Sequence, residues 1–149
     1  AACLCATPQP IAGARCLHVG DMHYQPLASP SYVARYFPDG PSLNAFQHAP
    51  AIVFGPHDQL QHQFLAQWGY QGYFPYHLCP SSEGFVRLAA AGIGYGMIPQ
   101  RQAAESLQSG QLVSIAPGHG LTVPLYWHFW RHSGQLIQRL TERLSHLTL

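Results

Sequence analysis

Lysine is absent from this chain of 149 residues, and charged residues of any kind are scarce. The seven basic residues are all arginine and six residues are acidic, so charged residues make up 9% of the sequence, against about 25% in an ordinary soluble domain. A net charge of +1 leaves no basic stripe that could follow a phosphate backbone, and we do not expect this segment to bind nucleic acid by itself. The sparse charge predicts that another subunit or further chain covers part of its surface.

Long apolar runs are also missing. No segment approaches the length that spans a membrane, and no secretory leader precedes the four cysteines, so we expect reduced thiols, a cytoplasmic location and no membrane partner. A zinc site built from Cys3, Cys5, Cys16 and His18 is conceivable. The paired spacing of a zinc knuckle is absent, however, and small side chains that fill a strand are the favoured interpretation. We expect no metal and no cofactor.

Sequence signatures of catalysis are absent as well. There is no G-x-S-x-G elbow and no H-E-x-x-H pair. The glycines of residues 92–96 follow an expected helix and precede an expected strand, whereas nucleotide-binding loops run from a strand through glycines into a helix. The sequence therefore predicts a binding protein and not an enzyme.

What the sequence does contain is an alternation of strand and helix signals. A chain of this length can bury one substantial core, and 47% of its residues are hydrophobic. Apolar strand candidates alternate with helix candidates that end at glycine or proline, which predicts an α/β fold with a mostly parallel sheet flanked by helices. The strand candidates are residues 51–54, 76–79, 96–99 and 112–115.

Two longer strands, at about residues 22–29 and 123–130, bracket this alternating segment. After the second of them Ser133 is expected to start an amphipathic helix. The apolar stripe of that helix needs a partner surface. The stripe consists of Leu136, Ile137, Leu140, Leu144 and Leu147.

Hydroxyl side chains mark two helix starts. Ser29 is the expected N-cap of one helix, with Pro30 at the first helical position, and Ser81 and Ser82 start another after Pro80. The first N–H groups of a helix lack partners within it and carry the positive end of the macrodipole, so such a start can hold a carboxylate. Capping alone is the plainer alternative at each start.

Four blocks in order, residues 21–30, 35–40, 80–86 and 124–127, accompany a glycine-rich run over residues 89–99 that ends in Pro99. The run resembles a signature of the effector-binding domain of LysR-type transcriptional regulators. The four blocks together resemble the branch of that family that responds to arginine and lysine. The resemblance covers nearly the whole chain.

The resemblance implies a periplasmic-binding-protein-like (type 2) fold, in which two lobes bind a small effector in the cleft between them. It assigns residues 1–22 to a remnant of lobe I, residues 23–125 to lobe II, and residues 126–149 to a crossing strand and a C-terminal helix that return to lobe I. The partners it implies are a small effector and further copies in a homodimer or tetramer. DNA would be bound only through an N-terminal helix-turn-helix that this sequence does not contain.

The family places effector contacts on the strands and loops before such helix starts. The expected effector is arginine or lysine, for which Asp58 or Glu83 would supply the anion, although each could simply favour its own helix start. A lobe of a solute-binding protein for a small carboxylate or amino acid is the rival function. The expected effector-binding residues are Ser29, Pro30, Ser31, Asp58, Pro80, Ser81, Ser82 and Glu83.

Overall fold

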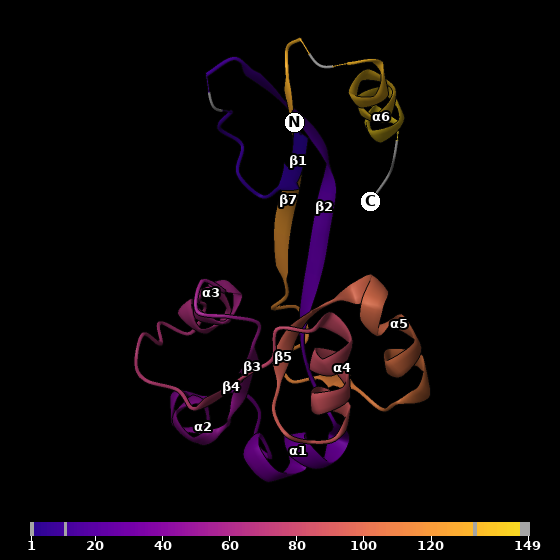
Figure 1. Cartoon of the computed structure of the whole chain (residues 1–149). Helices are drawn as coiled ribbons and strands as arrows, with labels where there is room; N and C mark the ends of the chain where they lie inside the picture. The colour runs from indigo at the N-terminus through magenta and orange to yellow at the C-terminus, as the bar shows by residue number, and fades with distance from the viewer. Residues whose placement is uncertain (1, 11, 133, 147–149) are drawn as a thin grey trace. The chain divides into compact units, whose positions relative to one another are not determined.

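The computed structural model describes residues 2–10, 12–132 and 134–146 of the chain (Figure 1). Ser133 and Leu147, both expected in the last helix, lie outside these ranges. The chain divides into two compact units: a discontinuous unit, Ala1–Met22 with Thr122–Leu149, and a central unit, His23–Leu121. Within the described ranges each helix is too short or too polar to cross a lipid bilayer.

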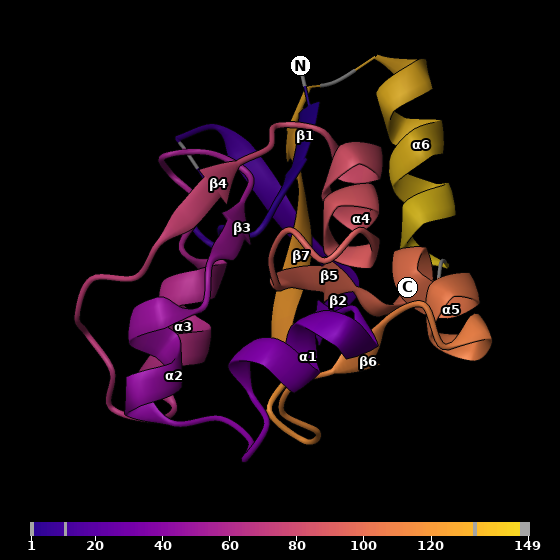
Figure 2. The ribbon, with the colours of Figure 1, turned by 90° about the horizontal axis from the view of Figure 1, so that it is seen from below.

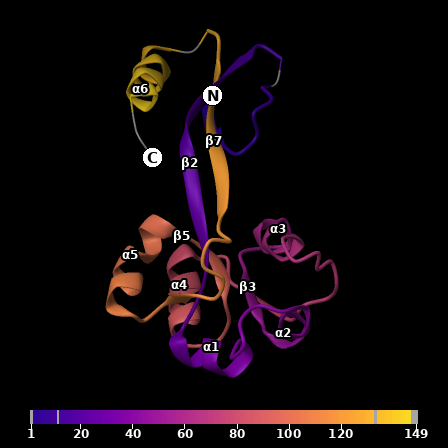
Figure 3. The same cartoon turned by 180° about the vertical axis from the view of Figure 1, so that it is seen from behind.

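The central unit alternates helices and strands, as the sequence predicts. In the views of Figure 1 and Figure 3, α2 and α3 lie on one side of β5, and α4 and α5 lie on the other. The α/β fold class is therefore confirmed. After β2 (Ala14–Ala28) the elements are α1 (Pro30–Tyr36), α2 (Leu43–His48), β3 (Ala51–Val53), α3 (Leu60–Ala66), β4 (Tyr76–Leu78), α4 (Ser82–Ala90), β5 (Gly96–Pro99), α5 (Gln100–Ser109) and β6 (Val113–Ser114).

Strand direction differs from the prediction. The short strands β3 and β4 lie side by side and pair in parallel (Figure 2), but β2 pairs antiparallel with both β5 and β6. The prediction of a mostly parallel sheet is thus wrong for the larger sheet, whose order is β1-β7-β2-β5 with β6 beside β2. A helical crossover enforces parallel pairing only between strands that it joins within one sheet, and β5 pairs with a strand from much earlier in the chain.

The hydroxyl caps predicted at two helix starts are confirmed. Ser29 Oγ accepts the backbone N–H of Tyr32 at 3.2 Å, and Pro30 is the first residue of α1. Ser81 Oγ accepts the N–H of Gly84 at 3.1 Å at the start of α4. Each hydroxyl satisfies a donor that the helix itself leaves unpaired, so these local signals determine where α1 and α4 begin.

Two hydrophobic clusters pack on opposite faces of β5. Met97 belongs to an aromatic cluster that also contains Phe64 and Tyr95. Its neighbour Ile98 belongs to a second cluster, with Phe85 of α4. Successive side chains of a strand point to opposite faces, so this short strand is buried on both sides and holds the two halves of the central unit together.

The discontinuous unit contains β1 (Ala2–Cys5), part of β2, most of β7 (Leu121–Trp130) and α6 (Gln135–Ser145). β1 pairs antiparallel with β7. Trp127 on β7 donates from Nε1 to Oγ1 of Thr141 on α6 at 2.8 Å. Leu136 and Leu140, from the predicted apolar stripe of α6, are 70% and 41% exposed.

Replacing Gly96 with alanine should destabilise the central unit. A Cβ atom there would lie 2.9 Å from Cζ of Phe85, and closer still to Cε1, so the ring or the strand must move. Overpacking of this kind costs about 1–3 kcal/mol in the free energy of unfolding. Gly55→Ala is the matched control, because nothing lies within 4 Å of its added Cβ. Urea unfolding compares the two variants, and equal stability would contradict the close packing of α4 on β5.

Candidate functional site

A cavity of about 560 Å³ opens in the central unit, beside the residues that follow β3. Its volume falls within the range of about 300–1,000 Å³ typical of small-molecule sites, and open α/β folds bind ligands at the carboxyl ends of strands. Its walls come from β2, the turn after β3, and the elements α3, α4, β5 and α5. The lining residues are Tyr24, Phe54, Gly55, Pro56, His57, Asp58, Leu60, Ser82, Phe85, Met97, Pro99 and Gln102.

The carboxylate of Asp58 is held by the backbone on both sides. Its Oδ2 accepts the N–H of Phe54 and its Oδ1 accepts the N–H of Leu60, each at 3.0 Å. An ionised carboxylate can accept about four hydrogen bonds, so roughly half of its capacity remains for a ligand. Asp58 therefore presents a fixed negative charge to the cavity.

Tyr24 lies near this charge. Burial raises the pKa of the Tyr24 hydroxyl, and the negative charge of Asp58 raises it further. The hydroxyl consequently stays neutral well above physiological pH and remains a hydrogen-bond donor. The rings of Tyr24, Phe54 and Phe85 make much of the remaining wall apolar.

The start of α4 forms another part of the wall. The carbonyl of Ser82 accepts a hydrogen bond from Nε2 of Gln102 at 2.8 Å, which ties α5 to this helix start. The first N–H groups of α4 carry the positive end of the helix dipole. The cavity thus combines an anionic side chain with a helix terminus that favours negative charge.

Asp58 and Ser82, two residues predicted from the sequence to bind the effector, line this cavity together. Pro80, Ser81 and Glu83 flank Ser82 at the start of α4, but they are not among the lining residues. Their contact with an effector stays a prediction.

The residues predicted at the start of α1 lie elsewhere in the central unit. Ser29 is 4% exposed, caps α1, and has its Oγ 3.1 Å from Oγ of Ser31. Pro30 and Ser31 are exposed. None of the three lines the cavity around Asp58. An effector role for them is likewise still a prediction.

Several lining residues were not predicted. Phe54 and His57 directly follow β3, and the rule that ligands bind beyond the carboxyl ends of strands could have indicated them. Tyr24 and Gln102 carry no comparable local signal. Their place in the wall depends on how β2 and α5 pack against the rest of the unit.

Across the part of the chain that the structure describes, no three His, Cys, Asp or Glu side chains are grouped so that they could hold a metal ion. Two residues of the conceivable zinc site have other neighbours. Cys16 Sγ lies 3.8 Å from Nε2 of His128, while Nε2 of His18 lies 3.0 Å from Oδ1 of Asp21.

Known proteins give a consistent match to this chain. The model of the LysR substrate binding domain family matches residues 2–148. The HTH-type transcriptional regulator ArgP of Pseudomonas aeruginosa (strain UCBPP-PA14) is 54% identical over 144 residues, which is 97% of this chain and 48% of that protein. The regulator of the same name from Pseudomonas fluorescens (strain Pf-5) is 50% identical over 99% of this chain and 50% of its own length. The chain therefore spans about half the length of the curated relatives it matches.

Solved structures agree with this match. ArgP from Mycobacterium tuberculosis has a TM-score of 0.89 at 32% identity, over 97% of this chain and 50% of that chain. The C-terminal domains of a LysR family protein from Agrobacterium tumefaciens give 0.91 at 35% identity, over 97% and 70%. Full-length LysG from Corynebacterium glutamicum with bound effector Arg gives 0.83 at 28% identity, over 97% and 49%.

Replacing Asp58 with asparagine should lower the pKa of Tyr24 without returning it to its ordinary value. The substitution removes the negative charge that opposes ionisation of the phenol, while burial, the larger cause, remains. An alkaline absorbance titration of each protein, minus the same protein carrying Tyr24→Phe, isolates this transition. An unchanged pKa would contradict the proximity of the two groups.

Proposed function

Since this chain belongs to the family of LysR substrate-binding domains, we propose that it is the effector-sensing part of a DNA-binding transcription regulator. Its curated relatives are named HTH-type transcriptional regulators and are about twice its length. The DNA-binding domain would be supplied by residues outside this sequence. That arrangement accounts for a segment with a net charge of +1 and no lysine, which lacks the basic surface that DNA requires.

In this proposal the effector is a basic amino acid, arginine or lysine. The observation that carries this proposal is the position of the Asp58 carboxylate, which lines the cavity and accepts hydrogen bonds from two backbone N–H groups. No arginine is among the described residues that line the cavity, so this carboxylate has no arginine partner in the lining. A fixed carboxylate with spare acceptor capacity forms short, charge-assisted hydrogen bonds with ammonium or guanidinium groups. The similarity to LysG with bound effector Arg supports this choice.

The two charges of such an amino acid match the two electrostatic features of the wall. The cationic end would donate to Asp58, and the α-carboxylate would lie at the start of α4, near Ser82. The methylene stem would cover the rings of Tyr24 and Phe85. The other predicted effector contacts do not line this cavity, and they stay part of the proposal as residues of the two helix starts: Ser29, Pro30, Ser31, Pro80, Ser81 and Glu83.

Residues 23–125 would then form lobe II of a two-lobe domain, and the remaining segments would belong to lobe I. We expect a homodimer or tetramer that contacts DNA only through the helix-turn-helix of the longer chain. The effector would shift the assembly between two arrangements, because it binds one of them more tightly than the other. A role as a lobe of a solute-binding protein is the alternative, but the named relatives favour the regulator.

Isothermal calorimetry on the full-length protein should show saturable binding of arginine or lysine, and Asp58→Asn should weaken it by about 10- to 100-fold. This range is what the loss of a hydrogen bond between charged groups costs. Glu105→Gln is the matched control, because it also replaces a carboxylate with an amide, but on an exposed residue outside the lining of the cavity.

Urea unfolding of Asp58→Asn, measured beside the wild type, ensures that weaker binding does not reflect lost structure. Absence of heat with both amino acids would refute the proposed effector. Equal weakening by Glu105→Gln would show that the carboxylate of Asp58 has no special part in binding.

The coding sequence upstream of this segment should encode a winged helix-turn-helix. Such a domain carries a recognition helix for the major groove of DNA. Sequencing the complete gene tests this expectation directly. A signal peptide in that place would instead favour the solute-binding alternative.

A further inference from the structure

A second cavity, of about 240 Å³, shares a wall with the first. Gly55, Pro56 and Asp58 line both cavities, so the turn after β3 separates them. The rest of its lining comes from the end of β3, α3, the loop after α3, and β4. Of the residues assigned to the proposed effector, Asp58 alone lines this space.

Aromatic rings form much of the second cavity. Tyr73 and Tyr76 are 78% and 53% exposed, whereas Phe74 is buried. The centroid of Phe74 lies 6.0 Å from that of Tyr76 and 5.2 Å from that of His62. These rings therefore gather around one space and are not scattered over the surface.

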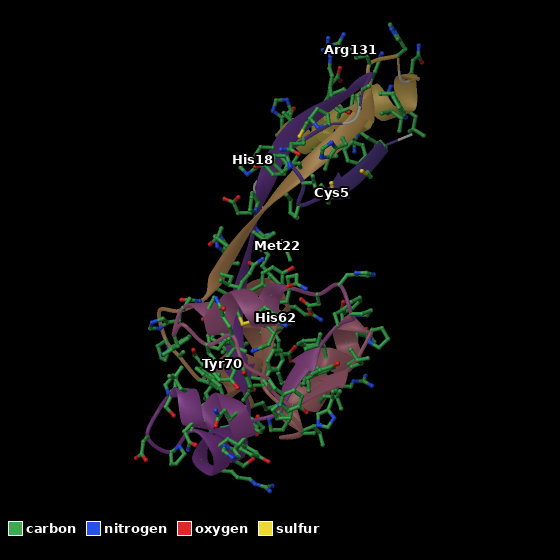
Figure 4. All side chains as sticks on the ribbon, turned by 90° about the vertical axis from the view of Figure 1, so that its left-hand side faces the viewer. Cys5, His18, Met22, His62, Tyr70 and Arg131 are labelled. Carbon is green, nitrogen blue, oxygen red and sulfur yellow. The ribbon has the colours of Figure 1, made fainter. Side chains whose placement is uncertain are left out.

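The loop that carries these rings is held in place. Tyr70 is 9% exposed, and its hydroxyl donates to the carbonyl of Tyr73. The carbonyl of Pro75 accepts the N–H of Ala51 on β3 at 2.9 Å. Gly72 packs so closely on Tyr70 that an added Cβ would lie 3.1 Å from its ring. Figure 4 labels Tyr70 and His62 among the side chains of the central unit.

The second cavity contains one carboxylate, that of Asp58, and its other ionisable side chains among the described residues are His62 and two tyrosines. No arginine is among these described lining residues, and the chain has no lysine. Aromatic faces attract cations through the negative face of the ring, and a nearby carboxylate adds to the attraction. A pocket built from tyrosine faces and one fixed carboxylate therefore favours an organic cation over a neutral or anionic ligand.

We propose that the second cavity binds a small organic cation with a guanidinium or alkylammonium head group, held by Tyr73 and Tyr76 against Asp58. The site takes the cation by its head alone, since no arginine in its lining could pair with a carboxylate of the ligand. This inference goes beyond the proposed function, because a regulator with a different effector in the first cavity would still contain this site.

The test uses the full-length protein with fluorotyrosine in place of tyrosine. N-methylguanidinium chloride is added as the probe ligand. Fluorine NMR should show saturable shifts for Tyr73 and Tyr76, assigned through tyrosine-to-phenylalanine variants. Tyr126, which lies on β7 with its ring centroid 5.4 Å from that of His18, should not shift. Absence of a saturable shift at Tyr73 and Tyr76 would overturn the proposal.

Two variants at position 76 test whether the aromatic ring of Tyr76, and not only the size of its side chain, contributes to binding of the probe. Tyr76→Leu should weaken binding of the probe by about two- to fivefold, and Tyr76→Phe, which keeps the aromatic face, should retain it. Tyr73→Leu repeats the test outside β4 in case the first variant does not fold. Equal affinities of the leucine and phenylalanine variants would contradict the role of the ring.

Two further measurements distinguish this cation site from the proposed effector site and from a protein interface. Ser82→Ala, which changes the first cavity alone, should leave the shift of Tyr73 unchanged. If the unsubstituted protein binds neither arginine nor lysine but shows that shift, only the proposed effector is refuted. Light scattering on Tyr76→Leu reports the oligomeric state. A changed oligomer with unchanged affinity for the probe would identify a protein interface and overturn the cation site.

Discussion

The carboxylate of Asp58 bridges the turn between β3 and α3. It accepts the N–H of Phe54 just after β3 and the N–H of Leu60 at the start of α3, each at 3.0 Å. These two hydrogen bonds do more than stabilise a helix start, because the turn forms a wall of both cavities in the central unit. The same carboxylate therefore borders both cavities.

Packing on β5 supports the remaining walls. Its residues contribute to both hydrophobic clusters, and the absence of a side chain at Gly96 lets Phe85 of α4 lie close against the strand. This close approach brings the start of α4, with Ser82, to the first cavity, where Gln102 of α5 donates to the Ser82 carbonyl. The close packing of Phe85 on Gly96 thus also helps to form the wall of the first cavity.

Much of the fold could be predicted from local signals. The resemblance to LysR-type regulators is confirmed by the family match, and the caps at Ser29 and Ser81 are confirmed by their hydrogen bonds. The predicted parallel pairing holds for β3 and β4, but it is wrong for the larger sheet, because β2 pairs antiparallel with β5 and β6, which lie far along the chain. Hydrophobic alternation reports that a segment is a strand, but it does not report which strand lies beside it.

The sequence by itself indicated most helices and strands, but it did not indicate that the long strand predicted at about residues 22–29 begins at Ala14. It also indicated that Asp58 and Ser82 stand near element ends, and which family the chain resembles. Only the tertiary structure decided that these two residues share a cavity with Tyr24 and Gln102, and that Asp58 also borders a second, aromatic cavity. The reason is physical. A cap or a strand depends on residues a few positions apart, whereas a cavity wall depends on side chains that come together only when distant segments pack.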